Sequence, residues 1–176
     1  MEDLSLHILD IAENAVAAQA SKIEIRLVED KKKDLLSLEV ADNGIGMDKE
    51  TQKRAIDPFF TSKNVRRFGL GLSLLSESAK AANGHLSIES QPGKGTKIKA
   101  DFQHSHIDRK PLGDIGQTIL TLIVGNPDID IIYIHKKDGH KLVLNTRKIR
   151  SRLKHIPLNS PDGIRMIKEE LRKVAE

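Results

Sequence analysis

The chain has 176 residues, which is enough for one ordinary domain and a small appendage and excludes large barrels and multidomain machines. Hydrophobic residues make up 38% and charged residues 31%, with no tryptophan and no cysteine, so we expect a soluble globular protein without disulfides or thiolate chemistry. No apolar run approaches the roughly 18 residues of a membrane span, and the acidic N-terminal sequence does not resemble a signal peptide. A cytoplasmic protein with no membrane partner is therefore expected.

Charge is distributed unevenly along the chain. Residues 1–103 carry 15 basic and 16 acidic side chains, a net charge of −1, whereas residues 104–176 carry 14 basic and 9 acidic side chains, a net charge of +5. This difference predicts two units with different roles, a first domain over 1–103 and a small basic α/β module over 104–176. An acidic partner or a nucleic acid could meet the second unit, although a solvated basic face explains the same excess.

The hydrophobic periodicity of the first unit predicts alternating helices and strands. A charged turn at 30–34 joins two alternating strands into a hairpin, and Asn83-Gly84 has the composition of a left-handed helix cap. We expect helices over 4–19 and 71–82, and strands over 22–28, 35–41, 85–90 and 96–102.

The second unit follows a soft boundary at 104–111 and has an α-β-β-α pattern. Its last helix begins near Ser160-Pro161, where a capping residue precedes an N-terminal proline in the favoured order. We expect helices over 112–124 and 161–174, and strands over 129–135 and 141–145.

A first polar motif, DIAEN, lies inside the first predicted helix. Asp10 and Asn14 are four residues apart and project from one helix face. A carboxylate and a carboxamide on one face can position a hydroxyl group and coordinate a hard cation through oxygen. Taken alone, the motif could equally be a polar stripe on a surface helix.

Three glycine-containing motifs follow. Asp42 precedes Gly44 and Gly46 at the end of a strand, where a carboxylate can accept a hydrogen bond from an exocyclic amine and the glycines allow close approach to a flat ligand; a tight turn is the alternative. FGLGL, at 68–72, opens a helix and favours an anion such as phosphate. GKGT, at 93–96, leads into a strand and could be a simple hairpin turn.

The order of these motifs resembles the GHKL (Bergerat-fold) superfamily of gyrase, heat-shock chaperone, histidine kinase and mismatch-repair ATPases. DIAEN resembles the N box, ADNGIGM the first glycine box, FGLGLSLL the second and PGKGTKI the last. DPFFTSK, at 57–63, resembles the F box of the histidine-kinase branch. The resemblance covers about residues 1–103 and implies a two-layer α/β sandwich, with helices on one face of a mixed sheet and a mobile lid over about 47–68.

The resemblance implies a role for each matching residue at the purine and magnesium end of an ATP site. Asn14 would be the Mg²⁺ ligand and Asp42 the adenine reader, with Thr96 supporting Asp42. Gly44 and Gly46 would form the turn beside adenine.

For the phosphates, the resemblance implies a cradle formed by Gly69, Leu70 and Gly71, with positive charge from the lid. Lys63 and Arg67, together with Arg66, would be triphosphate partners, although Arg67 could instead face solvent.

Asp10 occupies the place where hydrolytic members carry a glutamate base, and its shorter side chain departs from that pattern. His7, three residues earlier, is expected to pack in the helix interface or to orient this base.

The leading functional hypothesis is a stand-alone ATP-binding, histidine-kinase-like protein that phosphorylates or regulates a separate protein in an ATP- and Mg²⁺-dependent way. The given sequence contains no phosphoacceptor-histidine hairpin, so the acceptor is expected on a partner. Residues 104–176 would dock that partner or form a homodimer.

Two alternatives remain open. The first is an ATP-dependent binding switch, similar to an anti-sigma regulator, with little or no phosphotransfer. The second is nucleic-acid binding through the basic stretch 136–154, which lacks aromatic stacking residues.

Overall fold

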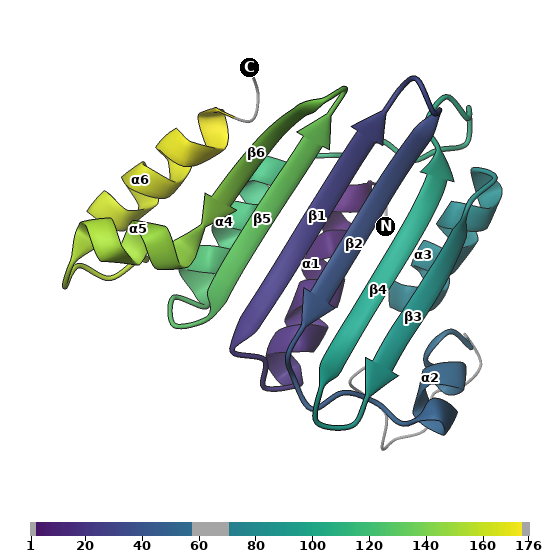
Figure 1. Cartoon of the computed structure of the whole chain (residues 1–176), viewed down its shortest axis with the longest axis horizontal. Coiled ribbons are helices and arrows are strands. Elements are labelled where there is room, and N and C mark those ends of the chain that lie inside the picture. Colours follow the sequence, from purple (N-terminus) through teal and green to yellow (C-terminus); the bar gives the residue numbers. More distant parts are fainter. Residues whose placement is uncertain (1–2, 58–70, 174–176) are drawn as a thin grey trace.

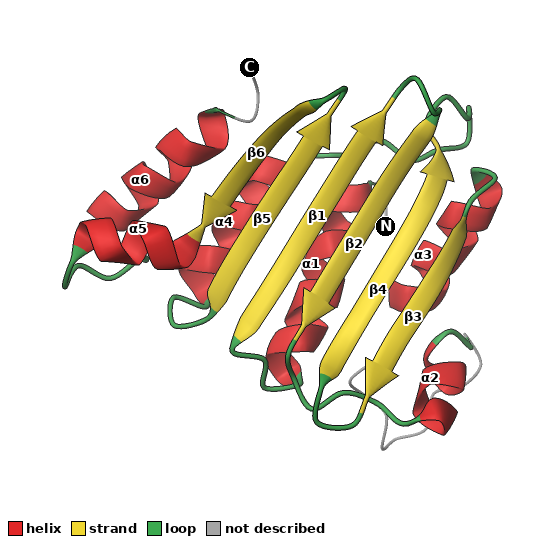
Figure 2. Ribbon diagram, viewed as in Figure 1, coloured by secondary structure: helices red, strands yellow, loops and turns green. Residues whose placement is uncertain are grey.

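A computed structural model describes residues 3–57 and 71–173, in which six strands form one mixed sheet in the order β3-β4-β2-β1-β5-β6. Figures 1 and 2 show α1, α3 and α4 behind one face of the sheet, with α5 and α6 beyond β6. The expected α/β sandwich, with helices covering one face of a mixed sheet, is confirmed. In chain order the elements are α1 (Leu4–Ala17), β1 (Lys22–Asp30), β2 (Leu35–Asp42), α2 (Lys49–Ala55), α3 (Gly71–Ala81), β3 (His85–Gln91), β4 (Gly95–Gln103), α4 (Ile115–Gly125), β5 (Asp130–Lys137), β6 (His140–Asn145), α5 (Thr146–Leu153) and α6 (Pro161–Arg172).

Helix α1 begins where its sequence supplies a cap. The Asp3 side chain accepts a hydrogen bond from the Leu6 backbone N–H at 3.1 Å, which satisfies one of the free amides of the first turn. The apolar residues recur every three or four positions, so one helix face is buried against the sheet. Truncating a fully buried member such as Ile8 to alanine would cost roughly 2–5 kcal/mol.

The β1–β2 hairpin has the expected alternation. Ile23, Ile25 and Leu27 of β1 are completely buried, whereas the residues between them face the other side of the sheet. Leu27 pairs with Leu38 across the antiparallel ladder. Asp34 closes the turn in the left-handed region, with φ 51°, and its side chain binds Ser105 after β4. The hairpin is thereby tied to the chain that leaves the first predicted unit.

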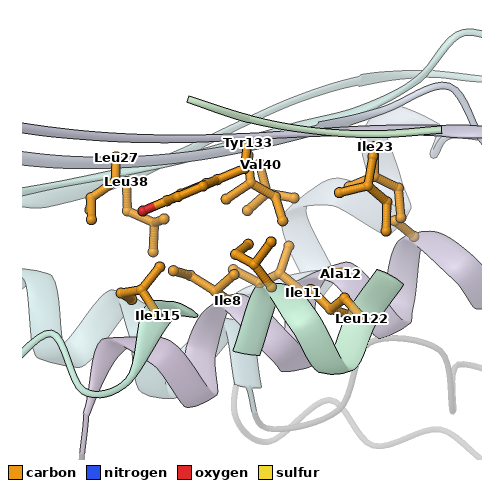
Figure 3. Packing of buried hydrophobic residues seen from close by; sticks show 14 of the residues in the cluster. Ile8, Ile11, Ala12, Ile23, Leu27, Leu38, Val40, Ile115, Leu122 and Tyr133 are labelled. Carbon is orange, nitrogen blue, oxygen red and sulfur yellow. The ribbon is translucent and has the colours of Figure 1, made fainter. Parts of the chain in front are cut away.

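The strands of the second predicted unit extend the same sheet. β5 pairs with β1 in parallel, with Tyr133 opposite Ile25, and α4 covers the sheet in the crossover before it. Figure 3 shows Tyr133 among the sheet residues that face Ile8 and Ile11 of α1 and Ile115 of α4. One hydrophobic core therefore runs through both units, and the division of roles between 1–103 and 104–176 stays a prediction.

Three local expectations differ from the structure. The helix expected from residue 112 begins at Ile115, because the Asp114 side chain caps the Gln117 backbone N–H at 2.8 Å. Helix α2 lies within the expected lid over about 47–68, for which no helix was predicted. Helix α5 adds a helix to the α-β-β-α pattern, capped by the Asn145 side chain, which accepts from the Arg147 backbone N–H at 2.9 Å. None of the helices in the described parts of the chain is long and apolar enough for a bilayer.

Candidate nucleotide site

The predicted site residues that the structure describes gather where β2 and β3 end, β4 begins and the last turn of α1 lies (Figure 1). This part of the molecule is called the site edge below. Asp42 is the last residue of β2, and Thr96 is the second residue of β4. Because β2 and β4 are paired antiparallel neighbours, the end of one strand lies beside the start of the other.

Asp42 is held by backbone amides at this edge. The Gly44 N–H donates to its carboxylate at 2.7 Å, and the Thr96 backbone N–H donates to the same group. Burial raises the pKa of Asp42, and these two amides oppose the rise only in part. The Thr96 backbone amide therefore contacts Asp42, and the carboxylate keeps acceptor capacity for a ligand.

The loop after Asp42 requires its glycines. Gly46 has φ +68°, and a side chain there would collide with the Gln91 carbonyl oxygen at the end of β3. At Gly44 an added Cβ would lie 2.6 Å from the Ala18 carbonyl oxygen. The Ile45 N–H donates to that oxygen at 3.0 Å, which fixes the loop against the end of α1.

The contact between the Ile45 N–H and the Ala18 carbonyl also places Asn14 at the site edge. The Ala18 N–H donates to the Asn14 carbonyl at 2.9 Å, so one helical turn separates Asn14 from the residue that touches Gly44. Asn14 is half-buried. A carboxamide oxygen is a suitable ligand for Mg²⁺, and this one lies at the same end of the sheet as Asp42.

Asp10 lies one turn earlier on α1, against the start of α3. A Cβ on Gly71 would collide with the Asp10 carboxylate, so glycine is required for the two helices to approach there. Among the described residues, Oδ2 of Asp10 is buried and has no hydrogen-bond partner. Burial raises the pKa of this carboxyl group. A buried carboxylate oxygen without a partner can still accept a proton or a hydrogen bond.

His7, on the same helix, is a neutral core histidine. It is 1% exposed, and neither ring nitrogen has a hydrogen-bond partner among the described residues. Burial, with a smaller effect from the charge of Lys110, lowers the pKa of His7 to about 4. The packing role expected for His7 fits this burial, whereas its base-orienting role stays a prediction.

Ser90 of β3 is a site-edge residue that the sequence analysis missed. Its hydroxyl oxygen accepts the Met47 N–H at 2.8 Å and lies 2.9 Å from the Gly95 carbonyl and 2.8 Å from the Thr96 hydroxyl. Gln52 of α2 donates to the Ser90 carbonyl at 2.7 Å. A signal for Ser90 was present in the sequence, because Ser90 precedes the GKGT turn and a β3–β4 hairpin would place it opposite Thr96.

A cavity of about 580 Å³ opens beside these groups, which is within the usual range for small-molecule sites. Its walls come from the ends of the strands and from α2. The lining includes Asp42, Lys49, Gln52, Ser90 and Thr96.

Part of the expected site lies outside the described residues. This applies to the four predicted phosphate-binding residues Lys63, Arg67, Gly69 and Leu70, to Arg66, and to most of the expected lid. Of the expected lid, Met47 is buried in the core and α2 packs near β3.

The basic stretch of residues 136–154 is partly neutralised within the fold. Arg147 and Arg150 contact the Asp130 carboxylate at 2.6 and 2.5 Å, and Arg152 contacts Glu170 at 2.9 Å. Arg150 also donates to the Ile129 carbonyl at 2.7 Å. These arginines anchor α5 to neighbouring elements, which reduces the positive charge offered to a nucleic acid.

Comparison with known sequences agrees with this geometry. The sequence profile described as "Histidine kinase-, DNA gyrase B-, and HSP90-like ATPase" matches residues 2–106. The sensor histidine kinase YxdK of Bacillus subtilis is 35% identical over 106 residues, covering 56% of this chain and 32% of the relative. The histidine-protein kinase AtoS of Escherichia coli is 37% identical over 89 residues, covering 50% of this chain and 14% of the relative. This chain spans about a third or less of these relatives.

Two solved structures share the fold. The N-terminal domain of a DNA repair protein has a TM-score of 0.60 at 19% identity, covering 86% of this chain and 56% of that one. The Aquifex aeolicus MutL ATPase domain complexed with ADP has a TM-score of 0.52 at 15% identity, covering 98% of this chain and 70% of that one. Both likenesses extend beyond residues 1–103, since they cover 86% and 98% of this chain.

Proposed function

Because the chain belongs to the family of histidine kinase-, DNA gyrase B- and HSP90-like ATPases, we propose that it binds ATP with Mg²⁺ at the site edge and phosphorylates or regulates a separate protein. The observation that carries this proposal is the half-buried Asp42 carboxylate, which the Gly44 and Thr96 amides contact at the same end of the sheet as Asn14. The kinase relatives support the phosphotransfer part, and a partner protein is the expected acceptor.

The residues present fit both ligands chemically. Asp42 has acceptor capacity for the adenine amino group, and Gly44 and Gly46 allow the loop beside it to pack closely against Ala18 and Gln91. Asn14 would hold Mg²⁺ through its amide oxygen, and the magnesium ion, when bound, neutralises phosphate charge.

Asp10 is proposed to accept the proton of the attacking group. In that step the acceptor hydroxyl or imidazole forms a bond to the γ-phosphorus, the bond from this phosphorus to the bridging oxygen of ADP breaks, and the proton passes to Asp10. The buried, unpartnered Oδ2 atom and the raised pKa of Asp10 support this role, because such a carboxylate accepts a proton more readily than a solvated one.

The test combines calorimetric titration of ATP with transfer of labelled phosphate to proteins that co-purify in the presence of ATP. Asp10→Asn is expected to retain ATP binding within about threefold and to lose transfer by at least about 100-fold. Asp128→Asn, in the loop between α4 and β5, is the matched control and should retain both activities. Full transfer by Asp10→Asn would remove Asp10 from the mechanism.

The magnesium assignment has its own test. Asn14→Ala should weaken ATP binding in the presence of Mg²⁺ but leave the weaker, metal-free binding nearly unchanged. An unaltered response to Mg²⁺ in this variant would contradict the assignment.

The second candidate is an ATP-dependent binding switch without phosphotransfer. It is favoured by the contact of the Asp10 carboxylate with Gly71 at the start of α3, because a carboxylate packed between two helices is less accessible to an attacking hydroxyl or imidazole group. In that case ATP would bind with 1:1 stoichiometry and change the affinity for a partner protein, with no labelled product and no ADP released.

A further inference from the structure

The Ser90 hydroxyl makes three short polar contacts but has only one proton. The Met47 N–H must donate to it, because a backbone amide cannot accept. The Gly95 carbonyl can only accept, so the contact of 2.9 Å is a hydrogen bond only if Ser90 donates its proton there. The third contact, with Thr96 at 2.8 Å, joins two hydroxyl groups and could run in either direction.

One arrangement satisfies all three contacts. Ser90 donates to Gly95, and Thr96 must then donate its own proton to Ser90. In the reverse arrangement Ser90 would donate to Thr96, and its oxygen would face the Gly95 carbonyl oxygen with no proton between them. Because unsatisfied contacts between buried acceptors are costly, the first arrangement is favoured.

We propose that Ser90 is a specificity-determining residue, which directs the Thr96 proton away from the base, so that Asp42 and Thr96 present lone pairs, and no donor, to the 6-substituent of a purine. This inference rests on the proposed ATP binding at the site edge. A purine with a 6-amino group offers donors to such a pocket. A purine with a 6-oxo group places an acceptor against lone pairs and is rejected.

The surroundings hold the Ser90 hydroxyl in this state. Thr96 is 8% exposed, so little water is available to reorient its hydroxyl group. Gln52 of α2 donates to the carbonyls of both Met47 and Ser90, at 3.2 and 2.7 Å, which closes the side of the network that faces α2. The network therefore joins the glycine loop, two strand ends and α2 around one oxygen atom.

The experiment compares the dissociation constants of ATP and inosine triphosphate, measured by calorimetry with the full chain and Mg²⁺. The two nucleotides differ at the 6-position, where ATP carries an amino group and inosine triphosphate an oxo group, and at the adjacent N1, which carries a proton only in inosine triphosphate. The wild-type chain should bind ATP at least about 100-fold more tightly. Ser90→Ala frees the Thr96 hydroxyl to donate, so this ratio should fall about tenfold.

Two further variants and one control make the test specific. Thr96→Val removes the hydroxyl and should also lower the ratio, and adding Ser90→Ala to it should change the ratio no further, because the two residues act as one unit. Thr96→Val also carries the test if Ser90→Ala fails to fold. Ser87→Ala, on the opposite face of β3, should leave the ratio unchanged.

The outcomes separate this inference from the proposed function. A lower ratio in Ser90→Ala and in Thr96→Val, without further change in the double variant, supports the specificity role. Equal weakening of both nucleotides by Ser90→Ala would show a merely structural role and overturn it. Tight wild-type binding of both nucleotides would overturn the inference and leave ATP binding intact, whereas no binding of ATP would overturn the proposed function itself.

Discussion

The fold shifts the pKa values of acidic side chains in opposite directions at the site edge and in the C-terminal extension, which comprises residues 104–176. Burial raises the pKa values of Asp10 and Asp42, and among the described residues Oδ2 of Asp10 has no partner. In the C-terminal extension, hydrogen bonds from Arg150 and then Arg147 lower the pKa of Asp130. The contacts of Asp130 stabilise the fold, whereas the burial of Asp10 and Asp42 opposes folding.

The direction of the pKa shift therefore distinguishes carboxylates suited to function from carboxylates that stabilise the fold, although both kinds lie in one continuous sheet. A carboxylate that folding leaves desolvated and incompletely paired is a candidate for ligand binding or proton transfer. A carboxylate that two arginines enclose has its acceptor positions occupied and serves to anchor α5 beside β5. The same residue type therefore has two roles, and the neighbouring charges determine which one applies.

The largest expected effect is on nucleotide affinity. Asp42→Asn replaces an acceptor with a group that can also donate, and we expect the ATP dissociation constant to rise at least about 100-fold. Asp130→Asn is the matched substitution in the C-terminal extension and should leave ATP affinity unchanged. Calorimetric titration measures both. Equal losses in the two variants would remove the distinction between the regions.

His7 on α1 is a further titratable group whose charged form is disfavoured by burial. Its folded pKa of about 4 lies below the unfolded value of 6.5, so between these values the unfolded chain binds the additional proton. The free energy of unfolding should therefore fall as the pH drops from 7 to 5, by about 2 kcal/mol from this residue.

His7→Leu should remove that part of the pH dependence, measured by urea unfolding at both pH values. His140→Leu, at an exposed position in β6, is the control. A pH profile of His7→Leu that matches wild type would show that His7 does not carry the effect.

A smaller effect is expected from loss of the Asp130 anchor. Asp130→Asn weakens the contacts with Arg150 and Arg147, and we expect a loss of about 1.5 kcal/mol in the free energy of unfolding at pH 7. Because the folded pKa of Asp130 is lowered, this stabilisation is present above pH 3.8 and disappears as the pH falls through the folded pKa. Urea unfolding at pH 7 and pH 3 would detect it, and an equal loss at both pH values would contradict the assignment.

The smallest expected effect is an increase in the free energy of unfolding. Asp10→Asn removes a buried charge whose folded pKa is raised, so the free energy of unfolding at pH 7 should increase by under about 1 kcal/mol. At a pH below both the folded and unfolded values the gain should vanish, because the carboxyl group is then neutral in both states. Thermal unfolding at the two pH values measures the change. Destabilisation at pH 7 would mean that Asp10 serves the fold.

Much of the fold and the meeting of the motif residues could be predicted from the sequence. Strict alternation and a charged turn define the β1–β2 hairpin, and the glycine-containing loops follow strands whose pairing brings Asp42 and Thr96 together. The polar motif on α1 could be placed near them because a helix followed directly by a strand ends at the edge where that strand begins.

The features that could not be predicted depend on contacts between distant parts of the chain or on weak sequence patterns. β5 pairs with β1 across more than a hundred residues, and its hydrophobic pattern does not identify the neighbouring strand. Helices α2 and α5 are short and polar, with few buried residues, so their periodicity is weak. Ser90 was missed because a serine in an alternating strand is ordinary until the positions of Met47, Gly95 and Thr96 are known.

The most direct test of ATP binding at the site edge is amide chemical-shift mapping during titration of the full chain with ATP and Mg²⁺. We expect saturable shifts of the Gly44 and Thr96 amides, which contact the Asp42 carboxylate, and little change at the Asp138 amide, which donates to the Glu29 carbonyl at the opposite end of β1. Saturable shifts confined to the opposite end of the sheet, around Asp138, or no shifts at millimolar ATP, would contradict ATP binding at the site edge.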